Sequence, residues 1–123
     1  MIFGIGTDIV EIARIESVIN RYGDRFISRI LHPAEMSVSL TSRDIAKKFC
    51  AKEAVSKALG TGMRWPVFWR QIILCRDDMG KPYIETDDAL NDWLADRQLK
   101  LHVSLSDEKA YVVATVIAEH LPV

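Results

Sequence analysis

The spacing of apolar residues divides the chain into a helix-rich first part and a strand-rich last part. Residues 2–5 form a short apolar run with glycines, which favours a brief strand. Over residues 9–30, apolar side chains recur on one side at helical spacing. Gly23 is expected to break this stretch into a helix of about four turns and a shorter piece. Asp8, with Glu11 three residues later, predicts a capping box at the start of the first helix.

The middle of the chain predicts one long helix. A short helix is expected over residues 34–40, after a proline at position 33. Thr41 or Ser42 is then expected to cap a helix over residues 43–59, whose composition is dominated by strong helix formers. Gly60 is expected to end that helix in a left-handed conformation.

The last part of the chain alternates between strand patterns and turns. Strands are expected over residues 71–76, 83–85, 101–105 and 110–118, with a helix from about 87 to 97 between the second and the third. Gly80 marks the turn of a hairpin. Helices that cluster early and strands that cluster late predict a single α+β domain over residues 1–123, in which a mostly antiparallel sheet packs against the long helix.

Composition narrows the class of protein. The chain has 123 residues and a formal net charge of −1, which is typical of one globular domain and argues against a basic nucleic-acid-binding protein. No apolar run approaches the length of a membrane span, and the first residues lack the features of a secretory signal. Cys50 and Cys75 have neither zinc-site spacing nor the density of a disulfide scaffold, so a cytoplasmic protein with reduced thiols is expected.

Two carboxylates are candidates for chemistry. Glu53 and Lys57 share a face of the long helix, and they form either a surface ion pair or a site in which Glu53, among small apolar neighbours, is a metal ligand. Asp8 is either a helix cap or a second ligand at a strand–helix junction. Two carboxylates together with substrate phosphate oxygens suit Mg²⁺. Spacing alone leaves open whether Asp8 and Glu53 meet.

Four arginines form a second candidate site. Arg14, Arg21, Arg25 and Arg29 fall beside the apolar stripe of the early helical stretch. They form either a solvated basic face or a docking surface for an acidic partner, for which arginine is well suited because it binds carboxylates in a bidentate manner.

Taken together, these residues resemble a known family. Residues 4–12, 49–54, 57–62, 80–82 and 102–106 resemble holo-acyl-carrier-protein synthase, the small single-domain class of 4′-phosphopantetheinyl transferases. The match follows the order of the motifs over nearly the whole chain. The resemblance implies the 4′-phosphopantetheinyl transferase fold. It also implies an enzyme that moves the 4′-phosphopantetheine group of coenzyme A to a serine of an apo acyl carrier protein and releases adenosine 3′,5′-bisphosphate.

The resemblance also implies roles for individual residues. Asp8, Glu53 and Lys57 become the catalytic group, with Mg²⁺ held by the two carboxylates and Lys57 at the coenzyme A phosphates. Arg14, Arg21 and Arg25 become contacts of the acidic carrier protein. The coenzyme A contacts implied are Lys48, Ser56, Lys57, Gly60, Gly62, Lys81, Pro82 and Ser106. A homotrimer with active sites at the subunit interfaces is implied as well.

The chain departs from the family at a few positions. Asp107 stands where many members have a histidine, and the stretch over residues 36–44 is shorter than in typical members. The contacts of the nucleotide 3′-phosphate therefore stay open among Arg43, Lys47 and Lys48. The aromatic loop over residues 64–69 has no assigned role.

Two other functions use the same residues. One is a Mg²⁺-dependent phosphodiesterase, and the other is a non-catalytic module that binds coenzyme A or a carrier protein. The sequence also leaves open which group accepts the proton of the serine. It leaves open as well whether the carrier serves fatty acid biosynthesis or a secondary pathway such as polyketide assembly.

Overall fold

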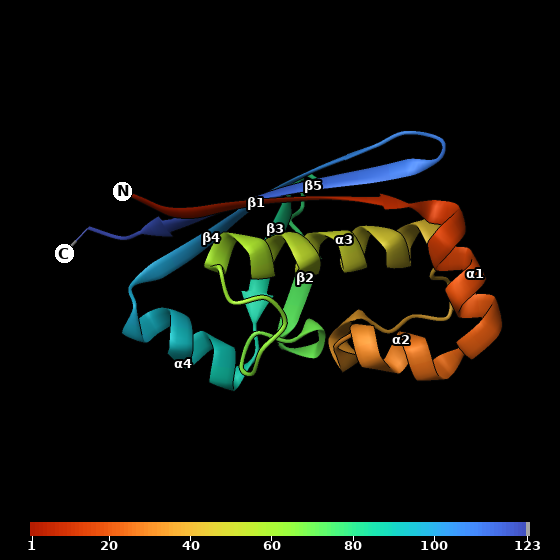
Figure 1. Ribbon diagram of the computed structural model, residues 1–123, viewed down its shortest axis with the longest axis horizontal. Helices are drawn as coiled ribbons and strands as arrows, with labels where there is room; N and C mark the ends of the chain where they lie inside the picture. Colours follow the sequence, from red (N-terminus) through yellow and green to blue (C-terminus); the bar gives the residue numbers. More distant parts are fainter. Residues whose placement is uncertain (123) are drawn as a thin grey trace.

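A long helix lies against one face of a three-stranded antiparallel sheet in the computed structural model, which describes residues 1–122 (Figure 1). The elements in chain order are β1 (Ile2–Glu11), α1 (Ile12–Tyr22), α2 (Asp24–Ile30), η1 (Pro33–Glu35), α3 (Ser42–Leu59), η2 (Trp69–Gln71), β2 (Ile72–Arg76), β3 (Pro82–Thr86), α4 (Asp88–Asp96), β4 (Leu99–Asp107) and β5 (Tyr111–His120). The sheet has the order β1–β5–β4, and β2 and β3 form a separate antiparallel hairpin. Within residues 1–122, no helix combines the length and the apolar character that crossing a bilayer requires.

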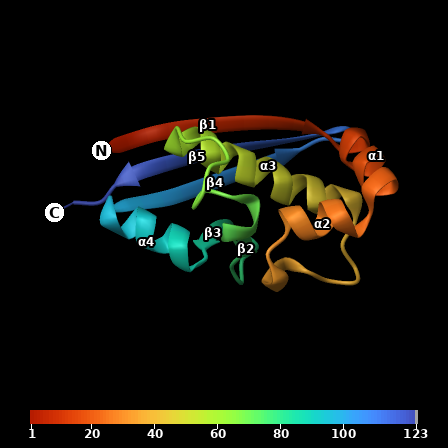
Figure 2. The same ribbon diagram turned by 60° about the horizontal axis from the view of Figure 1, so that its bottom comes forward.

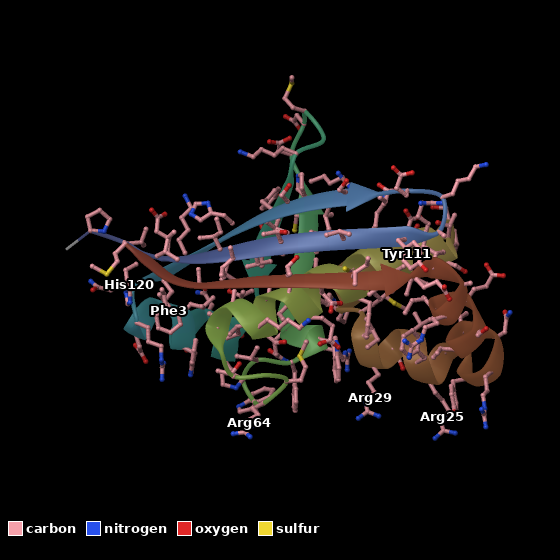
Figure 3. The ribbon with its side chains drawn as sticks, turned by 45° about the horizontal axis from the view of Figure 1, so that its top comes forward. Phe3, Arg25, Arg29, Arg64, Tyr111 and His120 are labelled. Carbon is pink, nitrogen blue, oxygen red and sulfur yellow. The ribbon has the colours of Figure 1, made fainter. Side chains whose placement is uncertain are left out.

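The smaller helices lie at opposite ends of α3. The pair α1 and α2 covers one end, and α4 lies toward the other, where both chain termini are found (Figure 2). At the terminal end, the backbone N–H of His120 donates to the carbonyl oxygen of Met1 at 2.7 Å. The ring of Phe3 meets His120 edge-on, with ring centroids 5.3 Å apart (Figure 3). These contacts hold the two strand ends together, and β1 stays paired with β5 as far as Glu11 and Tyr111.

Small residues bring α3 unusually close to the sheet. Every second residue of β5 from Val112 to Ala118 is fully buried, and α3 meets this face with alanines and Cys50. On β1, a Cβ at Gly4 would lie 2.0 Å from the carbonyl oxygen of Ala58. A Cβ at Gly6 would lie 2.1 Å from the carbonyl oxygen of Ala54. The two glycines are therefore packing residues that allow β1 to touch the backbone of α3.

Gly6→Ala is expected to destabilise the protein by ~3 kcal/mol, because the new methyl group would collide with backbone that has no flexible end to move. Gly80→Ala is the matched control. Gly80 has φ of 85° and open space around its Cβ position, so only the left-handed conformation costs free energy, about 1 kcal/mol. Urea unfolding of the two variants measures the difference. Equal losses would contradict the close-packing role of Gly6.

The strongest local signals in the sequence are confirmed. Gly23 separates α1 from α2, and Gly60 ends α3 with φ of 74°. Thr41 caps α3 in a capping box: its hydroxyl accepts from the backbone N–H of Asp44, whose carboxylate accepts from the N–H of Thr41. The hairpin with Gly80 at its turn and the antiparallel pairing of the strands are also as expected.

Three of the expected local structures are wrong. The brief strand expected over residues 2–5 is a ten-residue strand, β1, which takes in residues 9–11 of the expected helical stretch because they pair with β5. The capping box of Asp8 and Glu11 does not form, because β1 continues through Glu11 in register with β5 and α1 starts at Ile12 without a side-chain cap. The helix expected over residues 34–40 is reduced to the single turn of η1. The hydroxyl of Ser37 accepts a hydrogen bond from the backbone N–H of Ser39, and such local bonds compete with helix formation.

Candidate active site

Three of the residues singled out in the sequence meet where β1 passes α3. The ammonium group of Lys57 donates to a carboxylate oxygen of Asp8 at 3.0 Å and to the carbonyl oxygen of Thr7 at 3.0 Å. Glu53 lies one turn earlier on α3, and it lines the same pocket as Asp8. Lys57 thus reaches across to β1. The surface ion pair between Glu53 and Lys57, which their spacing allowed, does not form among residues 1–122.

The pocket concentrates negative charge. Burial and, second, the negative charge of Asp8 raise the pKa of Glu53, while the indole of Trp69 and the charge of Lys57 lower it. Lys57 is already paired with Asp8, so Glu53 keeps a charge that has no ion-pair partner among residues 1–122.

The same carboxylates fit a magnesium ion. In the described part of the chain, no cluster of three or more His, Cys, Asp or Glu side chains forms a metal cage. Mg²⁺ does not need one, because it binds through one or two carboxylates and completes its shell with water and substrate phosphates. Asp8 and Glu53 present oxygens to one pocket, and their mutual repulsion would be relieved by a cation. These two residues therefore suit the ion implied by the resemblance.

The pocket extends from the carboxylates toward α1 and α2. Its volume is about 520 Å³, and its walls include Arg14 together with the apolar side chains of Phe26 and Phe49. The charged end thus leads along an apolar wall to the first of the four arginines. A ligand in this pocket would touch both the carboxylates and the arginine-bearing helix.

The four arginines form a positively charged surface. All four are exposed, and none forms an ion pair with an acidic side chain among residues 1–122. They are Arg14, Arg21, Arg25 and Arg29. Arg25 and Arg29 line a hollow of about 270 Å³ between α1 and α2, and their side chains point outward on the same side of the molecule (Figure 3). We call the four residues the arginine face.

The residues implied as coenzyme A contacts are spread over several surfaces of the protomer. Gly60 and Gly62 line a pocket of about 510 Å³ with Trp65, beyond the end of α3. Lys81 and Pro82 line a different pocket, of about 410 Å³, between β3 and β4.

The remaining implied coenzyme A contacts lie at yet other places in the protomer. Ser106 is exposed at the end of β4, and Lys48 is half-buried on α3. Ser56 is buried, and its hydroxyl donates to the carbonyl oxygen of Glu53 at 2.7 Å, which leaves this side chain almost no surface for a ligand. The implied contacts therefore do not converge within one protomer.

Asp107 binds two of the basic residues considered for the 3′-phosphate. Its carboxylate accepts from Arg43 at 2.8 Å and lies 3.7 Å from the ammonium group of Lys47. Arg43 also donates to the carbonyl oxygens of Glu108 and Lys109. Arg43 is thus engaged by the β4–β5 turn, and Lys48 is the candidate that has no such ion pair among residues 1–122.

Sequence reasoning missed a buried ion pair next to Glu53. Lys52 is fully buried, and its ammonium group donates to the carboxylate of Glu35 and to the carbonyl oxygen of Ile30. The second carboxylate oxygen of Glu35 accepts from the backbone N–H of Leu74 at 3.0 Å. Burial lowers the pKa of Lys52 to about 8 despite the nearby Glu35. The pair ties α3 to α2 and β2, and the signal for it was a lone lysine among the small residues of a buried helix face.

Known proteins match this chain over nearly its whole length. The family model of the 4′-phosphopantetheinyl transferase superfamily matches residues 4–116. The holo-[acyl-carrier-protein] synthase of Dechloromonas aromatica is 46% identical over 124 residues, which cover 98% of this chain and 99% of that protein.

Solved structures agree over the same length. The crystal structure of holo-[acyl-carrier-protein] synthase from Neisseria meningitidis has a TM-score of 0.93 and 41% identity, covering 97% of this chain and 99% of that one. The Helicobacter pylori enzyme in complex with coenzyme A has a TM-score of 0.83 and 32% identity, covering 94% and 99%. The expected α+β fold is thereby confirmed. Because both the family model and these relatives span nearly its whole length, the chain belongs to the holo-[acyl-carrier-protein] synthase family of the 4′-phosphopantetheinyl transferase superfamily.

Proposed function

We propose that residues 1–123 form one enzyme domain that transfers the 4′-phosphopantetheine group of coenzyme A to a serine of an apo acyl carrier protein. The products are the holo carrier protein and adenosine 3′,5′-bisphosphate. The observation that carries this assignment for this chain is that Asp8 and Glu53 line one pocket and that Lys57 donates a hydrogen bond to the carboxylate of Asp8. Family membership, and the coenzyme A bound to the Helicobacter pylori relative, support the choice of substrate.

Asp8 and Glu53 are the residues that would hold Mg²⁺. When bound, the ion supplies positive charge that neutralises the diphosphate of coenzyme A and favours attack on its β-phosphorus. Asp8 is held in place from two sides: its backbone pairs with Ala114 of β5, and its carbonyl oxygen accepts from the thiol of Cys50 at 3.3 Å. Glu53 is fixed on the rigid helix α3.

Lys57 is suited to bind phosphate oxygens. Its side chain is long and about half exposed, and its ammonium group donates to the carboxylate of Asp8. When another positive charge satisfies Asp8, the donors of Lys57 become available for the diphosphate. Lys57 then stabilises the charge that builds up on the departing nucleotide phosphate.

The carrier protein is expected to approach over the arginine face. Arg14 belongs both to this face and to the pocket that holds Asp8 and Glu53. An acidic helix bound there would bring its serine to the charged end of the pocket. Holding the two substrates in this way supplies much of the rate, because it replaces a chance encounter by a fixed geometry.

We further propose that the enzyme is a homotrimer with its active sites at the subunit interfaces. Ile5 and Ile9 of β1 are 66% and 64% exposed, and they lie on the sheet face opposite α3, paired with Ile117 and Val113 of β5. An apolar sheet face of this kind is suited to burial against another subunit. The contact between two subunits would also bring together coenzyme A contacts that lie on different surfaces of one protomer.

The double variant Ile5→Lys/Ile9→Lys is expected to be monomeric and to lose most of its transfer activity, because each subunit would then bring two unpaired charges into an apolar interface. Light scattering should give about three times 13.9 kDa for the wild type and 13.9 kDa for the variant. Met79→Lys is the control, since Met79 is 92% exposed at the β2–β3 turn. A wild-type preparation that is active as a monomer would contradict the trimer and the shared sites.

The proposed reaction is tested directly by mass spectrometry. The protein is incubated with coenzyme A, Mg²⁺ and candidate apo carrier proteins, and one phosphopantetheine group is expected on each carrier that it serves. A carrier whose acceptor serine is replaced by alanine should stay unmodified, and EDTA should stop transfer. Hydrolysis of coenzyme A without a carrier would favour a phosphodiesterase, and binding without turnover would favour a non-catalytic module.

The two free cysteines accord with the expected cytoplasmic location. Cys50 and Cys75 are both free thiols. Proteins of oxidising compartments more often use their cysteines in disulfides. We therefore propose that the reaction takes place in the cytoplasm.

A further inference from the structure

Lys52 and Glu35 form an ion pair in the interior of the protein, and they are the only charged side chains that are buried among residues 1–122. Removing two charges from water costs free energy that their attraction only partly returns, so a buried pair is a weak source of stability. Its geometry, however, is defined, because the ammonium and carboxylate groups must stay at hydrogen-bond distance. The elements that this pair joins are therefore held at one separation.

The pair joins α3 to the end of α2 and to η1. The ammonium group of Lys52 donates to the carbonyl oxygen of Ile30, the last residue of α2, at 2.7 Å, and to the carboxylate of Glu35 in η1. The same carboxylate accepts from the backbone N–H groups of His32 at 2.9 Å and Leu74 at 3.0 Å. One buried side chain of α3 thus fixes the end of α2 and, through Glu35, the turn that follows it and β2.

The helix α2 depends on such contacts for its position. It has seven residues, and helices of this length are not stable alone in water. It carries Arg25 and Arg29, which are exposed and point outward (Figure 3). It also places Phe26 against Phe49 of α3, with ring centroids 6.2 Å apart. A displacement of α2 along α3 would therefore move two residues of the arginine face.

The attachment point on α3 lies beside the pocket that contains the two carboxylates. Lys52 directly precedes Glu53, and whereas Glu53 lines the pocket, Lys52 reaches α2 and η1. Phe26 of α2 and Phe49 of α3 line the same pocket. The distance between the arginines of α2 and the carboxylates is thus set next to Glu53 itself.

We propose that Lys52 is a positioning residue for the carrier protein: it binds the end of α2 and η1, and so holds the arginines of α2 at a fixed distance from the carboxylates of the pocket. A carrier bound to the arginine face is thereby aligned with its acceptor serine at the pocket. Without the pair, α2 would be held by apolar contacts alone, which allow it to shift. The role in carrier binding rests on the proposed function, whereas the fixing of α2 does not.

The fixing of α2 is tested by amide hydrogen exchange, followed by nuclear magnetic resonance. In the wild-type chain, the N–H of Leu31, which donates to Ile27 of α2, and the N–H of Leu74, which donates to Glu35, should exchange nearly as slowly as the amides of α3. Lys52→Met/Glu35→Gln removes both charges together and leaves no unpaired charge in the interior. In this double variant the amide of Leu31 should exchange at least about tenfold faster. Fast exchange in the wild type, or unchanged exchange in the double variant, would overturn the proposal.

The consequence for the carrier is tested with the same double variant in the transfer assay. Its KM for the carrier protein is expected to rise about tenfold, with the KM for coenzyme A nearly unchanged, because a small misplacement of a binding element is enough for such a loss. Asp87→Asn is the matched control. Asp87 pairs with His32 at 3.3 Å in the same connection, but this pair is partly exposed and should contribute little. A folded double variant with the wild-type KM for the carrier would overturn the positioning role.

Arg25→Ala separates positioning from a general loss of stability. In the wild-type background it is expected to raise the KM for the carrier about threefold, whereas in the double variant it should have little further effect, because Arg25 is no longer held in place. A purely structural role of the pair predicts the same factor in both backgrounds, since independent sites are additive. Equal factors would therefore overturn the proposal.

These measurements also distinguish this inference from the proposed function. If the wild-type chain transfers no phosphopantetheine group to any carrier, the proposed function fails, and hydrogen exchange still decides whether the pair holds α2. If the double variant does not fold, the wild-type chain decides: slow exchange at Leu31 and Leu74 would support the fixing of α2, and fast exchange would overturn it.

Discussion

Asp8→Asn and Glu53→Gln are each expected to lower kcat about a thousandfold, because each removes one of the two carboxylates proposed to hold Mg²⁺ at the diphosphate. Both substitutions keep the size and shape of the side chain. The measurement is transfer to an apo carrier protein, followed by mass spectrometry at saturating coenzyme A and Mg²⁺. Asp92→Asn is the control, since Asp92 is an exposed carboxylate on α4, remote in the fold from α1 and α2.

The loss of activity in these variants should not be accompanied by an equal loss of thermal stability. The pKa of Glu53 is raised in the folded protein, so the favourable contribution of its protonated form is lost as the pH rises through that pKa. At pH 7 the charged side chain therefore costs stability, and Glu53→Gln is expected to unfold at the same temperature as wild type or higher. An inactive, stable variant would identify a residue kept for function. An Asp8→Asn protein that melts early but keeps full activity per folded molecule would instead show a structural role.

Local sequence signals predicted the elements whose causes are local. Thr41, Asp44 and Gly60 lie within or beside α3, and the bonds and backbone angles that begin and end this helix involve only near neighbours. The same reasoning failed at Asp8, where a good local capping pattern lost to pairing with Ala114, more than a hundred residues further along the chain. Strand pairing is a property of two distant segments, and no pattern around Asp8 reports it.

In the candidate site, too, only the features with local causes could be predicted from the sequence. The spacing of Glu53 and Lys57 correctly placed both on one helix, but Lys57 binds Asp8, 49 residues away in the sequence. Gly6 matched no nucleotide-binding pattern. The reason why this position needs glycine is the backbone of α3 packed against it, which the sequence does not reveal. The ordered set of motifs, each weak alone, indicated the family that the comparisons then confirmed.

Replacing Arg14, Arg21 and Arg25 by alanine is expected to raise the KM for the carrier protein roughly tenfold and to leave the KM for coenzyme A nearly unchanged. The reason is that all three are exposed and lack acidic partners among residues 1–122, so their charge is free to act on an acidic carrier. Replacement by glutamate should raise the KM further, since repulsion is added to the lost attraction. Association of the wild-type pair should also slow with added salt, which screens charges beyond ~8–10 Å.

The decisive comparison uses charge removed from the opposite end of the molecule. Arg97 directly follows α4, and Lys100 lies on β4; both elements are far from α1 and α2 in the fold (Figure 2). The double alanine variant therefore lowers the net charge without touching the arginine face. If overall charge drives association, this control should raise the KM for the carrier in proportion to the charges removed. If the arginine face is the docking surface, only the triple variant should do so. An unchanged carrier KM in the triple variant would mean that the face is merely solvated, because isolated surface charges contribute little. The docking surface would then have to be sought on the aromatic loop between Trp65 and Trp69.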